Sequence, residues 1–297
     1  MTVPNLDRFS GIADVYDQFR PKVPAAFADL LIQLVGTPNL VVDVGCGTGL
    51  STRIWAGRAA QIIGIEPNRD MREEAKRRTM DTKAVPLFSL PHPPLPLPLG
   101  KGSQTHRMWR IIFLDRPNIR YQDGIGAKTG LADECADIVT VAQALHWMEP
   151  EPTFAEVARI LRPGGVFAAI DCDWPPCMNW EAEAAYNACM EQATRLIEER
   201  GYVKETRLWD KEGHLGRMEA SGHFRYVREV VLHHVEQGNA ERLVGVALSQ
   251  GRVAIALRNG INEDEAGVTA LRDVAERTLG NELKPWYFGY RVRLGIK

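Results

Sequence analysis

The stretch VVDVGCGTGLST, residues 41–52, decides the fold expected for this chain. A β-branched apolar run ends at Asp43, and three glycines then alternate with other residues before a segment of helical character. Glycine lets a backbone turn tightly and pass close to a ligand, and a helix that starts behind such a turn presents N–H groups to it. The stretch therefore predicts a strand, a nucleotide-type binding loop and a helix, in that order.

The glycine spacing, D-x-G-x-G-x-G, departs from the GxGxxG pattern of dinucleotide-binding loops. That pattern requires glycine at position 50, where Leu50 stands, and Asp43 would repel a pyrophosphate. An acid here suits a ligand with a positive charge and no phosphate, such as the ammonium and sulfonium of S-adenosyl-L-methionine. At the end of the next strand, Glu66 offers two oxygens that can accept hydrogen bonds from both hydroxyls of a ribose.

Apolar runs of strand length alternate with segments of helical period around this loop, which is typical of βαβ units and a parallel sheet. The strands expected in this part of the chain are 40–44, 61–66, 118–122, 136–142 and 165–171. Residues 152–165 predict an amphipathic helix that stops on Pro163 and two glycines. Later elements are expected as a long helix near 180–200, a strand near 226–235, helices between 239 and 282, and a last strand at 285–296.

Composition excludes several classes of partner. The formal charge is -2, with 36 basic and 38 acidic residues, so we expect neither nucleic acid nor a membrane surface as a partner. The five cysteines show no repeated CxxC spacing, which argues against a disulfide framework and a metal site. The N-terminus resembles no signal peptide, and no apolar run reaches the roughly 18 residues of a spanning helix. We expect a cytoplasmic protein with a small-molecule partner; the sequence leaves the oligomeric state open.

Residues 85–116 break the pattern. Six prolines fall between Pro86 and Pro98, so this segment cannot form a helix interior or a central strand. Without it, a helix end would connect to a strand through a short turn. We interpret it as a lineage-specific insertion or as translated intron sequence, which splice signals in the codons at its two ends would test. A Pro-rich loop that binds a partner is the alternative.

Four segments resemble, in order and spacing, the motifs of class I S-adenosylmethionine-dependent methyltransferases: VVDVGCGTG, GIEPNRDM, GLADECADIVTVAQALHW and ARILRPGGVFAAID. FSGIADVYDQFRP and ALHWM are similar to the small-molecule group that includes trans-aconitate methyltransferases. The resemblance covers nearly the whole chain apart from 85–116. It implies one α/β domain over 1–297 with a Rossmann-like fold: a seven-stranded, mostly parallel sheet with helices on both faces, whose last strand, 285–294, runs antiparallel between its neighbours. Helical cap or substrate-side segments are expected at 172–225 and 238–283.

The resemblance also assigns cofactor-binding residues. In the glycine loop, next to the methionine end of the cofactor, these are Asp43, Gly45, Cys46, Gly47 and Gly49. The ribose, adenine and sulfur contacts fall to Glu66, Pro67, Met71 and Gln143. After the third strand, Gly126 stands where the family commonly has a side-chain acceptor for adenine. Asp123 or the backbone groups of Ile125 and Ala127 are the alternatives for that contact.

Methyl transfer from a sulfonium is an in-line displacement with a neutral leaving group, so the enzyme mainly aligns and desolvates the partners. No metal is needed. A hydroxyl or amine acceptor benefits from a general base, whereas a carboxylate acceptor does not. His146, just past the fourth strand, is the candidate base. The alternatives are a substrate contact, or a structural histidine that stacks with Trp147.

Five residues are expected at the substrate side: Tyr16, Arg20, Trp147, Asp173 and Trp174. Tyr16 and Arg20 resemble the N-terminal segment that closes over the cofactor in related enzymes, and Arg20 can pair with a carboxylate. A surface ion pair between Arg20 and Asp17 is the alternative. For Asp173 and Trp174 the alternative to a pocket wall is a rigid loop.

These observations predict S-adenosylmethionine-dependent methyl transfer to a small organic acceptor, at oxygen. The alternative from another class is a non-catalytic cofactor-binding or scaffold protein that kept the fold, which the insertion and Gly126 favour. An NAD-dependent dehydrogenase is disfavoured by Leu50 and Asp43.

Overall fold

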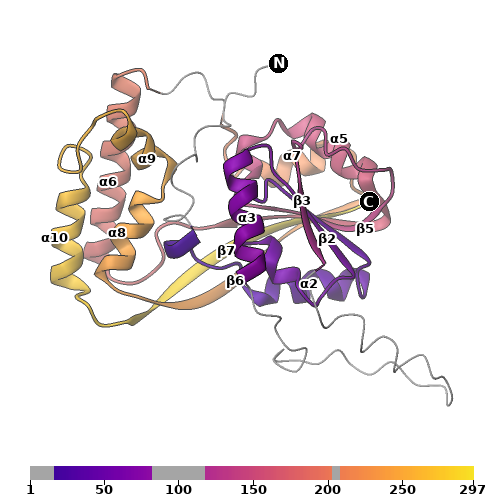
Figure 1. Cartoon of the computed structure of the whole chain (residues 1–297), viewed down its shortest axis with the longest axis horizontal. Helices are drawn as coiled ribbons and strands as arrows, with labels where there is room; N and C mark the ends of the chain where they lie inside the picture. Colours follow the sequence, from indigo (N-terminus) through magenta and orange to yellow (C-terminus); the bar gives the residue numbers. More distant parts are fainter. Residues whose placement is uncertain (1–16, 82–117, 203–207) are drawn as a thin grey trace, which may run out of the picture.

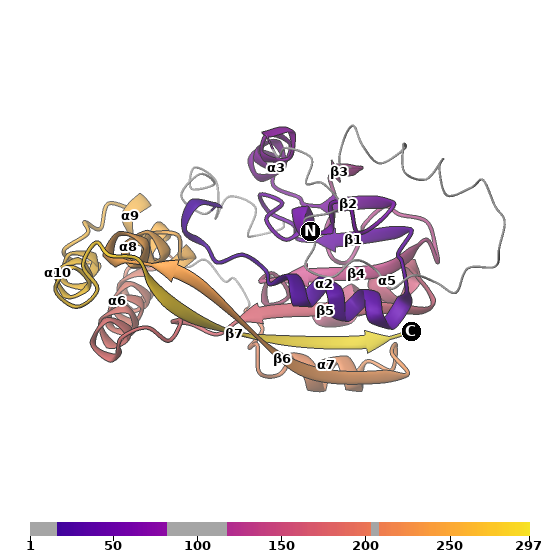
Figure 2. The same ribbon diagram turned by 90° about the horizontal axis from the view of Figure 1, so that it is seen from below.

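The computed structural model describes residues 17–81, 118–202 and 208–297, and these form a seven-stranded sheet with the strand order β3-β2-β1-β4-β5-β7-β6. Figure 2 views this sheet along its edge, so that the strands follow one another from β3 to β6. The strands are β1 (Leu40–Val44), β2 (Gln61–Ile65), β3 (Ile119–Gln122), β4 (Ala136–Ala142), β5 (Leu161–Cys172), β6 (Tyr226–Gly238) and β7 (Lys284–Ile296).

Strands β1 to β5 pair in parallel, and β7 pairs antiparallel with both β5 and β6. The predicted fold class and the antiparallel position of the last strand are therefore confirmed. The interpretation of residues 85–116 lies outside the described residues.

One predicted boundary was wrong. Helix α5 (Pro150–Ile160) ends before Leu161, which is already extended (φ -69, ψ 136), whereas the sequence predicted a helix up to Pro163. Helical geometry is disfavoured for Arg162, the residue before Pro163, because the proline ring crowds its backbone. Strand β5 consequently begins four residues before the strand expected from position 165.

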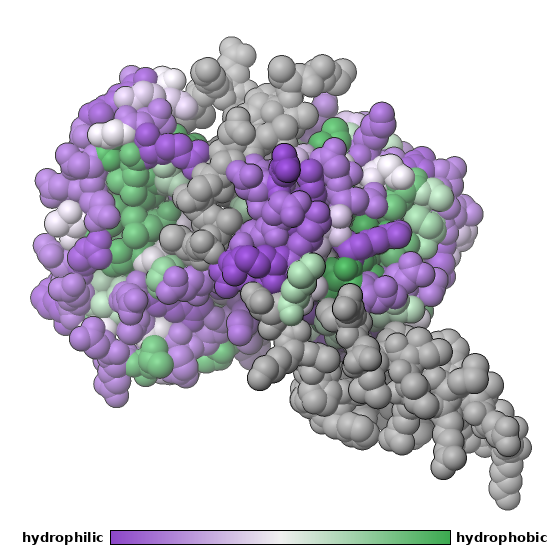
Figure 3. Space-filling view, in the orientation of Figure 1, coloured by the Kyte–Doolittle hydropathy of each residue, from purple (hydrophilic) through white to green (hydrophobic). Residues whose placement is uncertain are grey.

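Both faces of the sheet are covered by apolar helix surfaces. On one face, Phe27 and Leu31 of α2 (Ala25–Val35) pack in the same cluster as Val41. On the other, Phe154 of α5 packs with Val42. Successive strand residues point to opposite faces, so a strand buried on both sides becomes a continuous apolar run. Helix α3 (Arg69–Asp81) packs against β3, and its charged residues form the hydrophilic area in the middle of Figure 3.

Four helices pack together at one end of the sheet, and we call them the helical cap. They are α6 (Trp180–Glu199), α8 (Ala240–Leu248), α9 (Gly251–Arg258) and α10 (Val268–Thr278). Figure 1 shows them at the left, connected to the rest of the molecule by the long strands β6 and β7. Helix α7 (His214–Ala220), although it lies in the segment 172–225, contacts β6 and β7 instead. No helix in the three described ranges has the length and apolar character to cross a membrane.

Replacing Phe167 by alanine tests the packing of the β5 face. Phe167 is fully buried and its ring contacts those of Phe154 and Phe224 at 6.0 and 5.6 Å between centroids. Phe167→Ala is expected to lower the free energy of unfolding by about 3–5 kcal/mol, because the cavity left cannot close fully. Urea denaturation followed by circular dichroism measures it. Trp180→Ala, which removes a largely exposed ring, is the control, and an equal loss in both variants would contradict this account of the core.

Candidate functional site

The glycine loop joins β1 to one turn of 3-10 helix, η1 (Thr52–Trp55). Gly45, Gly47 and Gly49 have φ of 69, 54 and 75°, a region that glycine adopts far more readily than other residues. The backbone N–H groups of Gly45 and Cys46 both donate to Ile65 O, at 2.8 and 3.1 Å, which fixes the loop to the end of β2. The sequence predicted an α-helix after the loop, but residues 52–57 contain only this one turn of 3-10 helix. The chain then leaves helical geometry at Gly57, whose φ is 73°.

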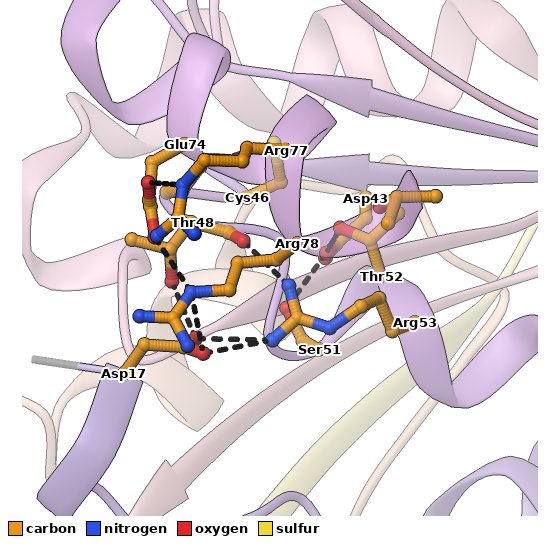
Figure 4. Close-up of polar contacts among 12 residues, drawn as sticks. Asp17, Asp43, Cys46, Thr48, Ser51, Thr52, Arg53, Glu74, Arg77 and Arg78 are labelled. Atoms are coloured by element: carbon orange, nitrogen blue, oxygen red, sulfur yellow. Dashed lines mark hydrogen bonds and ion pairs between the residues drawn. The ribbon is translucent and has the colours of Figure 1, made fainter. Parts of the chain in front are cut away.

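Asp43 lies beneath the loop. Its side chain is fully buried, and it accepts hydrogen bonds from Ser51 Oγ and Thr52 Oγ1, both at 2.7 Å, and from Thr140 Oγ1 at 2.9 Å. Burial raises the pKa of Asp43, and the three hydroxyl donors lower it. Figure 4 shows Asp43 turned toward Ser51 and Thr52. The carboxylate therefore holds the loop on β4, and its predicted direct contact with a ligand is not what the structure shows.

Glu66 lies at the end of β2 and faces the same loop. Its Oε2 accepts from Gly47 N at 3.0 Å, and its Oε1 accepts from Asn68 N at 2.9 Å. Burial raises the pKa of Glu66, while these two backbone donors and nearby Arg72 lower it. Each carboxylate oxygen keeps a second lone pair that can accept from a ribose hydroxyl. Glu66 is thus fixed in position and remains able to bind a diol.

A cavity of about 540 Å³ opens beside the loop, and we call it the loop cavity. Ten of the residues predicted to bind the cofactor line it: Gly45, Cys46, Gly47, Glu66, Pro67, Met71, Ile125, Gly126, Ala127 and Gln143. Asp43 and Gly49 do not. Gly49 instead packs closely against Tyr121. A Cβ atom added at position 49 would lie only 2.3 Å from Tyr121 Oη.

A second cavity of about 880 Å³ lies under the helical cap, and we call it the cap cavity. Its lining includes His146, Tyr186, Lys211 and Arg252. Four residues line both cavities: Arg20, Gln143, Trp147 and Trp174. The two cavities therefore share a wall formed by the tip of β4 and by side chains that were predicted at the substrate side.

Arg20 binds the helical cap. Its Nε donates to Ser249 Oγ at 3.0 Å, its Nη2 donates to Gln250 Oε1 at 2.9 Å, and its guanidinium lies 5.2 Å from the centre of the Trp174 ring. The alternative ion pair between Arg20 and Asp17 is not formed. Asp17 instead accepts hydrogen bonds from Arg53 Nη2 and Thr48 Oγ1, both at 3.0 Å (Figure 4).

Two other predicted substrate residues have different outcomes. Asp173 lines neither cavity; its half-exposed carboxylate accepts from Arg291 Nε at 3.2 Å. That ion pair turns it toward β7 and solvent, so the expected pocket contact was wrong for the conformation described. Tyr16 lies outside the described residues.

Gln143 occupies the shared wall in a strained backbone conformation. Its φ is 54°, which is rare for residues other than glycine and concentrates at functional sites. Its N–H donates to Ile170 O at 2.9 Å, and its Oε1 accepts from Lys211 Nζ at 3.0 Å. Lys211 also lies 3.1 Å from Asp171 Oδ1. Sequence reasoning missed Lys211, because it lies 68 residues from Gln143 in a segment without a recognisable motif.

His146 lines only the cap cavity. Its Nδ1 is 4.0 Å from Asp171 Oδ1, beyond hydrogen-bond length, and its ring centre is 4.8 Å from that of Trp147. The buried Asp171 side chain is held by Lys211 and by Arg293, whose Nη1 donates to Oδ2 at 2.9 Å. The base role of His146 stays a prediction. Within the described ranges, no group of three or more His, Cys, Asp or Glu is arranged to hold a metal ion.

Adding one methyl group at Gly49 tests the loop geometry. Gly49→Ala places a Cβ in the left-handed region and against Tyr121, so the loop or Tyr121 must move. We expect a loss of at least about 1–2 kcal/mol in the free energy of unfolding from the backbone alone. Gly216→Ala, inside α7 with nothing within 4 Å of the new Cβ, is the matched control and should stabilise the protein. Equal stability of the two variants in thermal unfolding would contradict the described loop.

Comparison with known proteins points to one family. Two models, both described as methyltransferase domain, match residues 41–91 and 104–169. The "Probable S-adenosylmethionine-dependent methyltransferase CRG1" of Saccharomyces cerevisiae is 28% identical over 154 residues, which are 52% of this chain and 43% of that protein. The uncharacterized methyltransferase Rv3342 of Mycobacterium tuberculosis is 28% identical over 157 residues, 53% of this chain and 49% of that one. The chain thus spans about half the length of the curated relatives it matches.

Solved structures show the same fold. A chain from Anaeromyxobacter dehalogenans, whose name assigns it to the type II methyltransferases, aligns with a TM-score of 0.56 at 17% identity, over 94% of this chain and 98% of that one. The YcgJ protein from Bacillus subtilis aligns with a TM-score of 0.50 at 16% identity, over 92% and 99%. Residues 41–91 and 104–169 are thus similar to methyltransferase domains, and the chain shares the fold of these solved structures.

Proposed function

We propose that this protein transfers the methyl group of S-adenosylmethionine to an oxygen of a small organic acceptor. The cofactor occupies the loop cavity and the acceptor occupies the cap cavity. The observation that carries this proposal is the wall of four residues common to both cavities. A donor in one cavity and an acceptor in the other would meet at this wall, which is the geometry that an in-line displacement requires.

The loop cavity fits the cofactor in size and chemistry. Its volume lies within the roughly 300–1,000 Å³ of small-molecule sites. Glu66 supplies a fixed carboxylate for the ribose hydroxyls, while Pro67, Met71 and Ile125 supply apolar surface for a purine. When bound, S-adenosylmethionine supplies an activated methyl group whose leaving sulfur is neutral.

The residues of the wall orient the partners and exclude water. Trp147 and Trp174 give the junction apolar surface, and Arg20 ties it to the helical cap. Since Oε1 of Gln143 accepts from Lys211, its amide nitrogen is the atom that can donate into the cavities. A donor at this point would hold an acceptor oxygen, or the cofactor carboxylate, in a fixed orientation.

The charges of the cap cavity favour an oxygen acceptor that carries a negative group. Lys211 and Arg252 are half-buried in its wall, whereas the acids Glu191, Glu198 and Glu199, which also line it, are exposed to solvent. For a carboxylate acceptor no base is needed; for a hydroxyl acceptor, His146 is the candidate base. The "Malonyl-[acyl-carrier protein] O-methyltransferase" of Pectobacterium atrosepticum, 25% identical over 162 residues (54% of this chain, 49% of that protein), also supports oxygen as the acceptor.

We place the protein in the cytoplasm with a small-molecule substrate and no nucleic-acid or membrane partner. The nearly neutral charge and the five free cysteines support this placement, because a reducing compartment keeps thiols free.

Calorimetric titration of S-adenosylhomocysteine tests cofactor binding. The full-length chain should bind it, and Glu66→Gln should weaken binding about tenfold or more through loss of a charge-assisted hydrogen bond. Glu181→Gln, a partly exposed cap residue paired with Arg277, is the control. No binding by the folded chain, with binding of NAD instead, would overturn the proposal in favour of a dehydrogenase. A chain without residues 85–116 should bind at least as tightly if that segment is an insertion.

Methyl transfer to any acceptor in a substrate screen would exclude the non-catalytic alternative. With such an acceptor, Lys211→Met is expected to lower kcat/KM for the acceptor by about 10- to 100-fold, because Gln143 loses its charged partner. The KM for S-adenosylmethionine should change little. Lys76→Met, on α3 and outside both cavities, is the matched control. An unchanged kcat/KM in Lys211→Met would show that Lys211 has no role in binding or positioning the acceptor.

A further inference from the structure

One end of the loop cavity is formed by residues 124–127 and the start of α5. Two of the acceptors considered there from the sequence, Asp123 and the carbonyl of Ile125, already have partners. Asp123 is largely exposed, pairs with Arg72 at 2.8 Å and is not part of the lining. The N–H and C=O groups of Ile125 both bond Lys128, at 3.1 and 2.9 Å. A purine amino group placed at this end can therefore turn to another acceptor in the lining, the Ala127 carbonyl or a side-chain hydroxyl.

Gly126 lets the loop after β3 pack closely against Met148 and Thr153. A Cβ at Gly126 would lie 2.8 Å from Met148 Sδ and 3.1 Å from Thr153 Oγ1. No side chain fits there unless these groups move, which explains why a side-chain acceptor cannot stand at position 126. The thioether and the hydroxyl occupy the place that such a side chain would take.

Thr153 holds a buried hydroxyl without a hydrogen-bond partner in the part of the chain that the structure describes. The residue is 1% exposed and belongs to the lining of the loop cavity. Its N–H donates to Glu149 O at 3.2 Å, which fixes its backbone in the first turns of α5. A β-branched side chain in a helix has few allowed rotamers, so the hydroxyl is held in place. Buried hydroxyls normally have a partner, and a bound ligand would supply one here.

We propose that the hydroxyl of Thr153 accepts a hydrogen bond from the 6-amino group of the cofactor's adenine. This inference rests on the proposed function, because it needs the cofactor in the loop cavity. The amino group approaches the hydroxyl from the loop cavity, and the flexible thioether of Met148 moves aside to admit it. Adenine is then recognised from helix α5.

Glu149 is the competing acceptor, since it also lines the loop cavity. Its side chain is exposed, so water satisfies it when no ligand is bound. Thr153 is sealed from water and gains its hydrogen bond only on binding. This difference assigns the contact to Thr153 and makes Glu149→Met, which removes the acceptor oxygens, an informative comparison.

The test compares two ligands by calorimetry: S-adenosylhomocysteine, and the analogue that carries hydrogen in place of the 6-amino group. The wild-type chain should prefer S-adenosylhomocysteine by about 5- to 10-fold, the effect of one hydrogen bond. Thr153→Val, which keeps the shape of the side chain, should reduce the preference to less than about twofold. Thr153→Ser should retain it. Thr278→Val on α10, which also removes a hydroxyl, is the control and should behave like the wild type.

Thermal unfolding midpoints confirm that each variant is folded. A preference that survives in Thr153→Val would overturn the inference, and so would a preference lost in Glu149→Met but kept in Thr153→Val. In both cases S-adenosylhomocysteine still binds and the proposed function stands. If the folded wild type binds neither ligand, the proposed function itself fails and the inference falls with it.

Discussion

The buried carboxylate of Asp43 is the interaction on which the site depends. It lies at the end of β1, and its three hydroxyl partners come from η1 and β4, so one side chain fixes the glycine loop at the boundary between two strands. The strand order reverses direction there, since β2 and β3 lie on one side of β1 and β4 and β5 on the other. Open α/β sheets bind ligands in the crevice at such a point. The loop cavity is found in this place.

The second cavity follows from the way the helical cap is attached. Strands β6 and β7 extend beyond the other strands and carry the cap helices next to the carboxyl ends of β4 and β5 (Figure 1). Residues 17–20 form a second link between the sheet and the helical cap. Asp17 binds the glycine loop, and Arg20 binds Ser249 of the cap. The strained backbone of Gln143 lies between these parts. Bringing donor and acceptor together thus depends on contacts between segments far apart in the sequence.

The sequence could predict the elements whose side chains follow a simple period. Strands buried on both faces, such as β1, appear as continuous apolar runs, and the alternating glycines predict the loop. The exact end of α5 was predicted too late, because the restriction on the residue before Pro163 was not applied. The structural role of Asp43 was missed: Ser51, Thr52 and Thr140 donate to its buried carboxylate, and it does not line the loop cavity.

Other parts of the site could not be predicted from local pattern. Lys211 and Arg252 reach the cavity wall, and Ser249 reaches Arg20, only through tertiary packing, and nothing in their sequence neighbourhoods indicates a ligand. Thr153 could not be predicted either, because in the sequence it is only one polar residue of an amphipathic helix. Its significance depends on the glycine at position 126, which is 27 residues away and close in space.

A crystal structure of the protein with S-adenosylhomocysteine tests the central claim, that two adjoining cavities bring a methyl donor to an acceptor. The account predicts that the ribose binds Glu66 in the loop cavity and that the sulfur faces Gln143 and the opening to the cap cavity. A ligand bound with its sulfur turned away from that shared wall, or bound under the cap, would contradict it.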